Sequence, residues 1–387
     1  MDLKADAARL GRANSGDDMM SRKFLLQHSL LLTAAMIPLS VPAAADSFTI
    51  VDGQVVNTTQ ELNAPGDVGI VESGGVIDAL HSGIFSTADG VTIRNAGSVT
   101  GTGVGDFEGI DGIFSLMNNN TIFNEGQSEA LVTADFALAT GVMANNESSI
   151  TNSGLAHGAS DGQQSVGWGI AMSNENHLVN TGLAWGAAVG VASTATGIEA
   201  NNGNIIENSG SSVADAVGDH SHAFGIAGGE RNRISNEGLV TAAVSGDVAD
   251  AYGISLIGES FDDHDNHIDN SGLISVRADG MGSSATGVWS GQGDFIANQR
   301  GGVIMATAVG YASRASGISS GDSDTIESAG DITVSSAGDY SSAAGLVAGR
   351  VNIIGNSGRI SAGANGDHSL AFGIVTQDAP APGDPGN

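Results

Sequence analysis

Two glycines recur as a pair along most of the chain, and their spacing limits the fold more than any other feature. The second glycine stands fifteen residues after the first in every pair and is followed by Ile, Val or Leu. The ten pairs are Gly97 and Gly112, Gly126 and Gly141, Gly154 and Gly169, Gly182 and Gly197, Gly210 and Gly225, Gly238 and Gly253, Gly272 and Gly287, Gly302 and Gly317, Gly330 and Gly345, and Gly358 and Gly373. Such a period predicts a solenoid, because a repeat this short can bury an apolar face only by stacking on its neighbours.

Between the glycines, apolar and polar residues alternate with a period of two, which is typical of strands. In residues 234–246, for example, Ile234 and Val240 would point inward while Ser235 and Thr241 would face water. We expect equivalent strands of successive coils to pair in parallel. The sequence therefore predicts an all-β fold, a single-stranded parallel β-helix of about ten coils with a repeat of about 28 residues.

Asparagine stands two residues before the first glycine in most repeats, and we expect its side chains to stack in one internal ladder, amide to amide. These positions are Asn95, Asn124, Asn152, Asn180, Asn208, Asn236, Asn270 and Asn356. The other positions expected to face inward hold Ala, Gly and Ser as often as Ile or Val. We therefore expect a narrow, closely packed interior.

The first 45 residues have the features of a signal peptide. Arg22 and Lys23 form a positive flank, residues 24–41 are mostly apolar, and the three alanines at 43–45 predict cleavage before Asp46. The alternative is a membrane anchor, but the apolar run contains polar residues and a proline and is short for a span.

The rest of the chain divides into three parts. We expect residues 46–90 to cap the N-terminal end of the β-helix and residues 91–375 to form its repeats. Residues 376–387 are rich in Pro and Gly and are expected to form an extended tail outside the sheets. A tail of this linker-like composition suggests truncation or a lost domain.

Composition narrows the classes of function. The chain has 43 acidic against 13 basic residues and a formal net charge of -30, so it should repel the phosphates of nucleic acids. It has no cysteine, which excludes disulfides and thiolate chemistry and fits a secreted protein stabilised by its length.

One loop departs from the repeat in a way that suggests a metal. A six-residue insertion after Gly258 places Asp262, Asp263 and Asp265 in the acidic, histidine-containing segment 259–267. Clustered carboxylates suit a hard cation, so these three residues are candidate Ca²⁺ ligands. The alternative is a solvated polar loop.

Two further features have a structural alternative. His220 and His222 invite a metal interpretation, but the same Gly-Asp-His-Ser turn recurs at residues 366–369, which favours a structural turn. Trp168, Phe224, Tyr252 and Phe372 stand immediately before the second glycine of their repeats. They would form a sugar-stacking stripe if they point outward, or pack under a loop if they do not.

Repeats of the form Ile-x-Asn-x-Gly-x-Ile, followed by Ala-x-Gly-Ile, resemble the passenger regions of autotransporters and related bacterial surface adhesins. The resemblance covers about residues 91–375. It implies a right-handed β-helix that is secreted or displayed at the outer membrane of a bacterium. The implied partners are a host or neighbouring-cell surface, including its glycans, and a translocator barrel acting in trans or lost by truncation.

We therefore expect a structural or adhesive protein that mediates attachment or aggregation, without catalytic residues and with no cofactor other than the candidate Ca²⁺. The alternative is a β-helical polysaccharide lyase or hydrolase. Such enzymes need a basic group with a cation, or paired carboxylic acids at a fixed separation. The few arginines here are scattered, and a strongly anionic surface would repel a uronate polymer.

Overall fold

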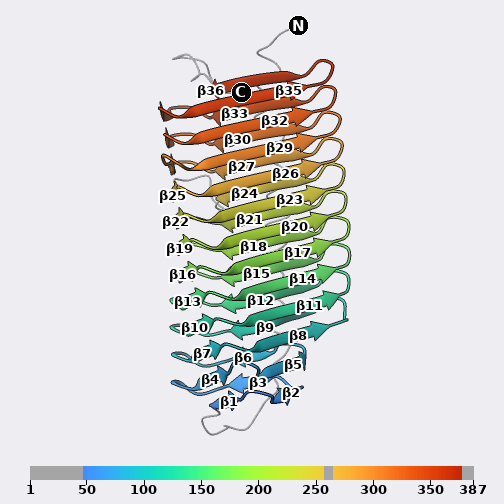
Figure 1. Cartoon of the computed structure of the whole chain (residues 1–387), viewed down its shortest axis with the longest axis vertical. Helices are drawn as coiled ribbons and strands as arrows, with labels where there is room; N and C mark the ends of the chain where they lie inside the picture. The colour runs from blue at the N-terminus through green and yellow to red at the C-terminus, as the bar shows by residue number, and fades with distance from the viewer. Residues whose placement is uncertain (1–46, 257–264, 377–387) are drawn as a thin grey trace, which may run out of the picture.

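A computed structural model describes residues 47–256 and 265–376. Every regular element in these residues is a β-strand, and the strands form three parallel twelve-stranded sheets stacked into a rod (Figure 1). Sheet A consists of β1 (Phe48–Ile50), β4 (Val68–Val71), β7 (Thr92–Asn95), β10 (Thr121–Asn124), β13 (Ser149–Asn152), β16 (His177–Asn180), β19 (Ile205–Asn208), β22 (Arg233–Asn236), β25 (His267–Asn270), β28 (Phe295–Asn298), β31 (Thr325–Ser328) and β34 (Ile353–Asn356).

The other two sheets have longer strands in the regular coils. Sheet B consists of β2 (Val55–Val56), β5 (Val76–Leu80), β8 (Ser98–Gly103), β11 (Gln127–Thr133), β14 (Leu155–Asp161), β17 (Leu183–Val189), β20 (Ser211–Val217), β23 (Leu239–Ser245), β26 (Leu273–Asp279), β29 (Val303–Val309), β32 (Asp331–Ala337) and β35 (Arg359–Asn365). Sheet C consists of β3 (Gln60–Leu62), β6 (Ile84–Ser86), β9 (Gly109–Ser115), β12 (Leu138–Ala144), β15 (Val166–Met172), β18 (Thr194–Ala200), β21 (His222–Gly228), β24 (Asp250–Leu256), β27 (Ser284–Ser290), β30 (Arg314–Ser320), β33 (Ser342–Ala348) and β36 (Leu370–Thr376).

The predicted parallel β-helix is confirmed. One coil contributes one strand to each sheet, and residues one repeat apart pair in register, as Ile206 does with Ile234. Each sheet has twelve strands because β1 to β6 add two shorter rungs below the ten predicted coils. In these rungs Phe48 pairs with Gly69 and Val68 with Thr92.

Both repeating glycines stand where two backbones approach closely. Gly154 lies between the strands of sheets A and B, and a Cβ atom there would collide with the carbonyl oxygen of Gly126. Gly141 lies inside β12, where a Cβ atom would collide with the backbone nitrogen of His157 on sheet B. The glycine spacing is therefore a steric requirement of the narrow cross-section.

Aliphatic side chains fill the interior in columns that run along the rod. The column from sheet A is at most 1% exposed from β7 to β31 and consists there of Ile93, Ile122, Ile150, Leu178, Ile206, Ile234, Ile268, Ile296 and Ile326. Parallel pairing in register stacks identical side chains, so one buried position per repeat produces a continuous core.

The predicted asparagine ladder is present, with two corrections: Asn298 belongs to it and Asn356 does not. Each side-chain Nδ2 donates to the Oδ1 of the next rung at 2.7–2.9 Å. This first ladder consists of Asn95, Asn124, Asn152, Asn180, Asn208, Asn236, Asn270 and Asn298. Asn298 escaped the sequence pattern because it stands four residues before Gly302. Asn356 is separated from the ladder by Ser328 and donates to the carbonyl of Gly358 instead.

A second ladder, absent from the sequence analysis, lies where each coil passes from sheet C to sheet A. Here a side-chain oxygen accepts the backbone N–H of the equivalent residue in the coil below, as the Oδ1 of Asn232 does from Asn204 at 2.8 Å. The second ladder consists of Asn120, Ser148, Asn176, Asn204, Asn232, Asn266, Asp294, Asp324 and Asn352.

Candidate functional site

The candidate Ca²⁺ loop lies mostly outside the described residues. Asp262 and Asp263 fall in the segment 257–264, of which the structure gives no description. Asp265 is exposed and occupies the turn before the second-ladder residue Asn266, with a φ angle of 51°. Within residues 47–256 and 265–376, no group of three or more His, Cys, Asp or Glu side chains is arranged to hold a metal. Calcium binding by the insertion stays a prediction.

The two histidines of the repeated turn point to different parts of the molecule. His220 is exposed at the turn between sheets B and C with a φ angle of 58°. His222 begins β21, where its Nδ1 lies 3.8 Å from a carboxylate oxygen of Asp250 and its ring lies against Phe224. Their placement therefore favours the structural interpretation of the turn.

The predicted aromatic stripe lies on sheet C. Trp168, Phe224 and Tyr252 are only 2–8% exposed, while Phe372 on the last strand is half-buried. Phe224 stacks on Tyr252 with ring centroids 5.2 Å apart, and Tyr252 stacks on Trp289 at 4.9 Å. Buried rings that cover one another do not offer a face to a sugar, so these side chains favour the packing alternative.

A polar and aromatic cluster stands on the outer face of sheet B. The ring of His157 stacks on Trp185 with centroids 4.3 Å apart, and the Nε1 of Trp185 donates to Asp215 at 3.0 Å. His157 also lies 3.6 Å from Glu129. Burial lowers the pKa of His157, and the charge of Glu129 opposes this shift. The two stacked rings cover one face of each other, and the Nε2 of His157 is buried.

The carboxylates of this cluster are too far apart for glycoside hydrolysis. Glu129 is on β11 and Asp215 on β20, three rungs along sheet B. At about 4.8 Å per rung they are about 14 Å apart, whereas paired catalytic carboxylates are about 5–9.5 Å apart.

Half of the exposed large apolar side chains in the described residues form a row along the turns between sheets B and C, the loops at the right-hand edge of Figure 1. We call it the B–C ridge, and all its members are at least 37% exposed. It consists of Val104, Phe107, Val189, Val191, Val217, Val248, Met281, Val309, Tyr311 and Tyr340. From Val189 to Tyr340 each coil contributes at least one member, whereas the coil of Gly154 has Asp161, Gln163 and Gln164 at these positions. Clustered exposed apolar side chains of this kind mark a candidate interaction surface.

Hydrogen bonds between successive turns hold the ridge in place. The Oδ1 of Asp219 accepts the backbone N–H of Asp247 at 2.9 Å, and the Oδ1 of Asp247 accepts that of Met281 at 2.8 Å. The same bond joins Asp339 to Asp367 at 2.9 Å. These acidic side chains therefore connect one turn to the next and fix the direction of the apolar neighbours.

Backbone conformation adds a second indication that the ridge has a role beyond folding. Val248 has a φ angle of 57°, which a β-branched residue rarely adopts. The equivalent residue one coil higher is Gly282, with a φ angle of 70°. Glycine would relieve the strain at 248, so the exposed valine side chain is not explained by stability.

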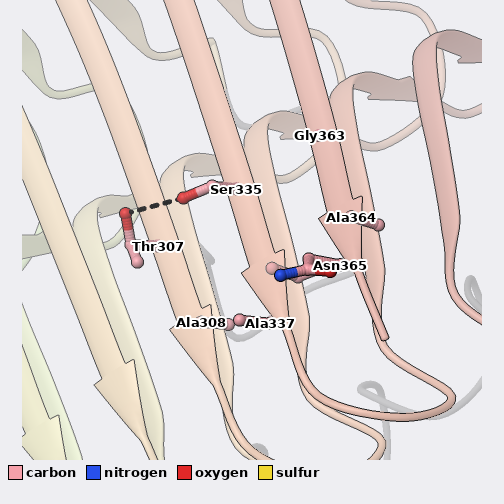
Figure 2. Close-up of a pocket in the computed structure, with 8 residues that line it drawn as sticks. Thr307, Ala308, Ser335, Ala337, Gly363, Ala364 and Asn365 are labelled. Atoms are coloured by element: carbon pink, nitrogen blue, oxygen red, sulfur yellow. Dashed lines mark hydrogen bonds between the residues drawn. The ribbon is translucent and has the colours of Figure 1, made fainter. Parts of the chain in front are cut away.

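A shallow hollow adjoins the ridge near the C-terminal end of sheet B (Figure 2). Its walls are short side chains from β29, β32 and β35, with Thr307 and Ser335 joined by a 3.1 Å hydrogen bond. The lining residues are Thr307, Ala308, Ser335, Ser336, Ala337, Gly363, Ala364 and Asn365. No acid, base or metal-ligating group lines it, so it lacks the parts of a catalytic site.

Sequence reasoning missed the ridge although a signal was present. Its residues stand seven, nine or ten positions after the first glycine, on either side of a third glycine at position eight. Apolar residues that recur at these turn positions face away from the core, because the turn reverses the chain between the two sheets.

Comparison of the chain with protein-family models, with curated proteins and with solved structures finds no match. In the described part of the chain there is no helix with the length and apolar character that crossing a bilayer requires.

Proposed function

We propose that this protein is exported and displayed at a bacterial cell surface as a rigid β-helix that mediates attachment or aggregation. The observation that supports this function best is the B–C ridge, which gathers half of the exposed large apolar side chains of the described residues on one edge of the rod. A ridge fixed by turn-to-turn hydrogen bonds is preorganised for contact with another surface, which lowers the entropic cost of binding.

The body of the molecule suits a spacer. Three continuous sheets connect every coil to the next, and two internal ladders add bonds along most of the rod. A load applied at one end is therefore shared among many hydrogen bonds. The chain resembles an autotransporter passenger in its repeats, and we infer that its partner is a host or neighbouring-cell surface. A glycan-cleaving activity is less well supported, because the carboxylates of the sheet B cluster are too widely spaced and the hollow near the ridge lacks titratable groups.

The test compares bacteria that display the full chain with bacteria that lack it, in attachment and autoaggregation assays. The ridge variant Val191→Ser, Val217→Ser and Val248→Ser should reduce attachment to the level of cells without the protein. The matched control changes three exposed apolar residues away from the ridge, Ile205→Ser, Val351→Ser and Ile353→Ser, and should attach like the unmodified protein.

Two outcomes would contradict the proposal. Equal attachment by the ridge variant and the unmodified chain would show that the ridge is not the contact surface. Turnover of pectin or alginate by the purified protein, abolished by one Asp or Glu substitution and without an attachment phenotype, would favour the enzyme. Mass spectrometry of the exported protein, with an N-terminus at Asp46 expected, tests the export signal separately.

A further inference from the structure

The second ladder changes chemistry at two successive rungs. Asp294 and Asp324 stand where most other rungs have asparagine, immediately before β28 and β31. Both side chains are 1% exposed. Two adjacent carboxyl groups in a buried column of amides require an explanation, because ionising a buried group away from water is energetically unfavourable.

Three amide rungs, Asn204, Asn232 and Asn352, use both ends of the side chain, whereas the Nδ2 of Asn266 is buried without a partner. The Oδ1 of Asn204 accepts the backbone N–H of Asn176 at 2.9 Å, while its Nδ2 donates to the carbonyl of Ser173 at 2.9 Å. The Nδ2 of Asn352 donates in the same way to the carbonyl of Gly321 at 2.9 Å. In each case the acceptor stands three residues before the ladder residue of the coil below.

Asp324 satisfies only half of this arrangement. Its Oδ1 accepts the backbone N–H of Asp294 at 2.8 Å, but its Oδ2 is buried and receives no N–H, and the hydroxyl of Ser320 is the only side-chain donor that acts on this carboxyl group. By the register of the ladder, the carbonyl that corresponds to Ser173 and Gly321 is that of Gly291. An ionised Oδ2 would place negative charge toward a carbonyl oxygen, whereas a protonated Oδ2 would donate to it as the amides do.

The charged groups that act on Asp324 are the carboxylates of Asp294, one rung below, and Asp322 in the same turn. Asp294 accepts the backbone N–H of Gly291 at 3.0 Å. Burial raises the pKa of Asp324 to about 7, and the charges of Asp294 and Asp322 add to the rise. The N–H of Asp294 and the hydroxyl of Ser320 oppose it.

We propose that Asp324 is a proton-operated joint in the rod: its protonated carboxyl group donates to the carbonyl of Gly291 and completes the second ladder, and loss of the proton loosens the rungs formed by β28 and β31. The ligand of this site is a proton, held between two coils. The joint would make the rod firmer in mildly acidic surroundings and more compliant above neutral pH.

The direction of the pH effect follows from linkage. The pKa of Asp324 in the folded chain, about 7, is above its ordinary value of 3.8. The folded state therefore binds the proton more tightly than the open state does. The stabilisation is complete below about pH 4, declines as the pH rises, and is lost once the pH has passed through about 7.

Hydrogen exchange measured from pH 5 to pH 8 on the full exported chain, in the presence of a chelator, tests the joint. After correction for intrinsic rates, local opening of β28 and β31 in the unmodified chain should increase by about tenfold per pH unit up to pH 7. In Asp324→Asn the amide donates at every pH, so opening should be independent of pH and slower at pH 8. A full pH response in Asp324→Asn, or faster opening than the unmodified chain at pH 8, would overturn the proposal.

Two control variants and one added ion complete the test. Asn232→Asp places the same carboxyl group in an amide rung and should create a pH response in β19 and β22. Asp339→Asn removes an exposed carboxylate of the B–C turns and should leave β28 and β31 unchanged. Adding Ca²⁺ to the unmodified chain at pH 8 should not slow the opening of these rungs. A marked slowing that is absent in Asp324→Asn would show that the site binds a cation and would overturn the proposal.

Discussion

The two internal ladders are built largely from asparagine, yet they tolerate different residues. The first ladder passes hydrogen bonds from side chain to side chain, so every member must both donate and accept. The second ladder passes them mainly from a backbone N–H to a side-chain oxygen, so a member can continue the ladder by accepting alone. Asn176 and Asn204 add longer side-chain bonds, from Nδ2 to the Oδ1 of the next rung at 3.1 and 3.2 Å. Accordingly the first ladder is all asparagine up to Ser328, whereas the second includes Ser148, Asp294 and Asp324.

This difference shows that the hydrogen bonds made at a buried polar position decide which residue types can occupy it. Serine at 148 still accepts the backbone N–H of Asn120 at 3.2 Å and donates to the carbonyl of Asn146 at 3.2 Å. Serine at 328 reaches Asn298 only at 3.5 Å. A short hydroxyl therefore serves the second ladder and interrupts the first.

The strongest test of this comparison is a serine in the middle of the first ladder. Asn180 donates to Asn208 Oδ1 at 2.7 Å and to the carbonyl of Ser211 at 3.1 Å, and it accepts from Asn152 at 2.8 Å. Asn180→Ser should lower the local free energy of opening by about 2–3 kcal/mol, because buried partners on both sides lose a bond. Hydrogen exchange of β13, β16 and β19 measures this loss. A cost below that of the matched change in the second ladder would contradict the comparison.

The matched change is Asn204→Ser, which should have a smaller effect. The serine hydroxyl can still accept the backbone N–H of Asn176, as Ser148 does from Asn120. The bonds that the Nδ2 of Asn204 donates to the carbonyl of Ser173 at 2.9 Å and, more weakly, to Asn232 Oδ1 at 3.2 Å are lost. We expect a local cost of about 1 kcal/mol in β16 and β19. Asn204→Leu is the control, since it removes the acceptor as well and should cost at least as much as Asn180→Ser.

The sequence predicted the features that require one particular residue type. It missed the features in which several residue types can make the same hydrogen bond. Gly154 and Gly141 mark positions where no side chain fits, so their spacing predicted the coil and its register. The first ladder was predicted because its bonds require asparagine. The second ladder accepts Asn, Ser or Asp, so no single letter marks it.

The sequence also could not predict which of two similar side chains is exposed and which is buried. Val248 on the ridge and Val244 in the core stand four residues apart in the same repeat, and only the path of the turn separates them. Likewise Asp324 is 1% exposed whereas Asp322, two residues before it, is half-buried. Such differences arise from the stacking of coils and not from the local pattern.

The smallest expected effect is a gain in stability when an asparagine replaces Ser328, the residue that interrupts the first ladder. Ser328 lies between Asn298 and Asn356, whose strands pair with β31 on either side. In Ser328→Asn, the new Oδ1 would accept from Asn298 and the new Nδ2 would donate to Asn356. We expect a stabilisation of about 0.5 kcal/mol, small because Asn356 is exposed and water already competes for its bonds. Slower exchange in β28 and β31, with β16 and β19 unchanged, is the expected result. Ser328→Ala is the control and should speed exchange slightly; if asparagine behaved like alanine, continuity of the amide chain would not be what stabilises the first ladder.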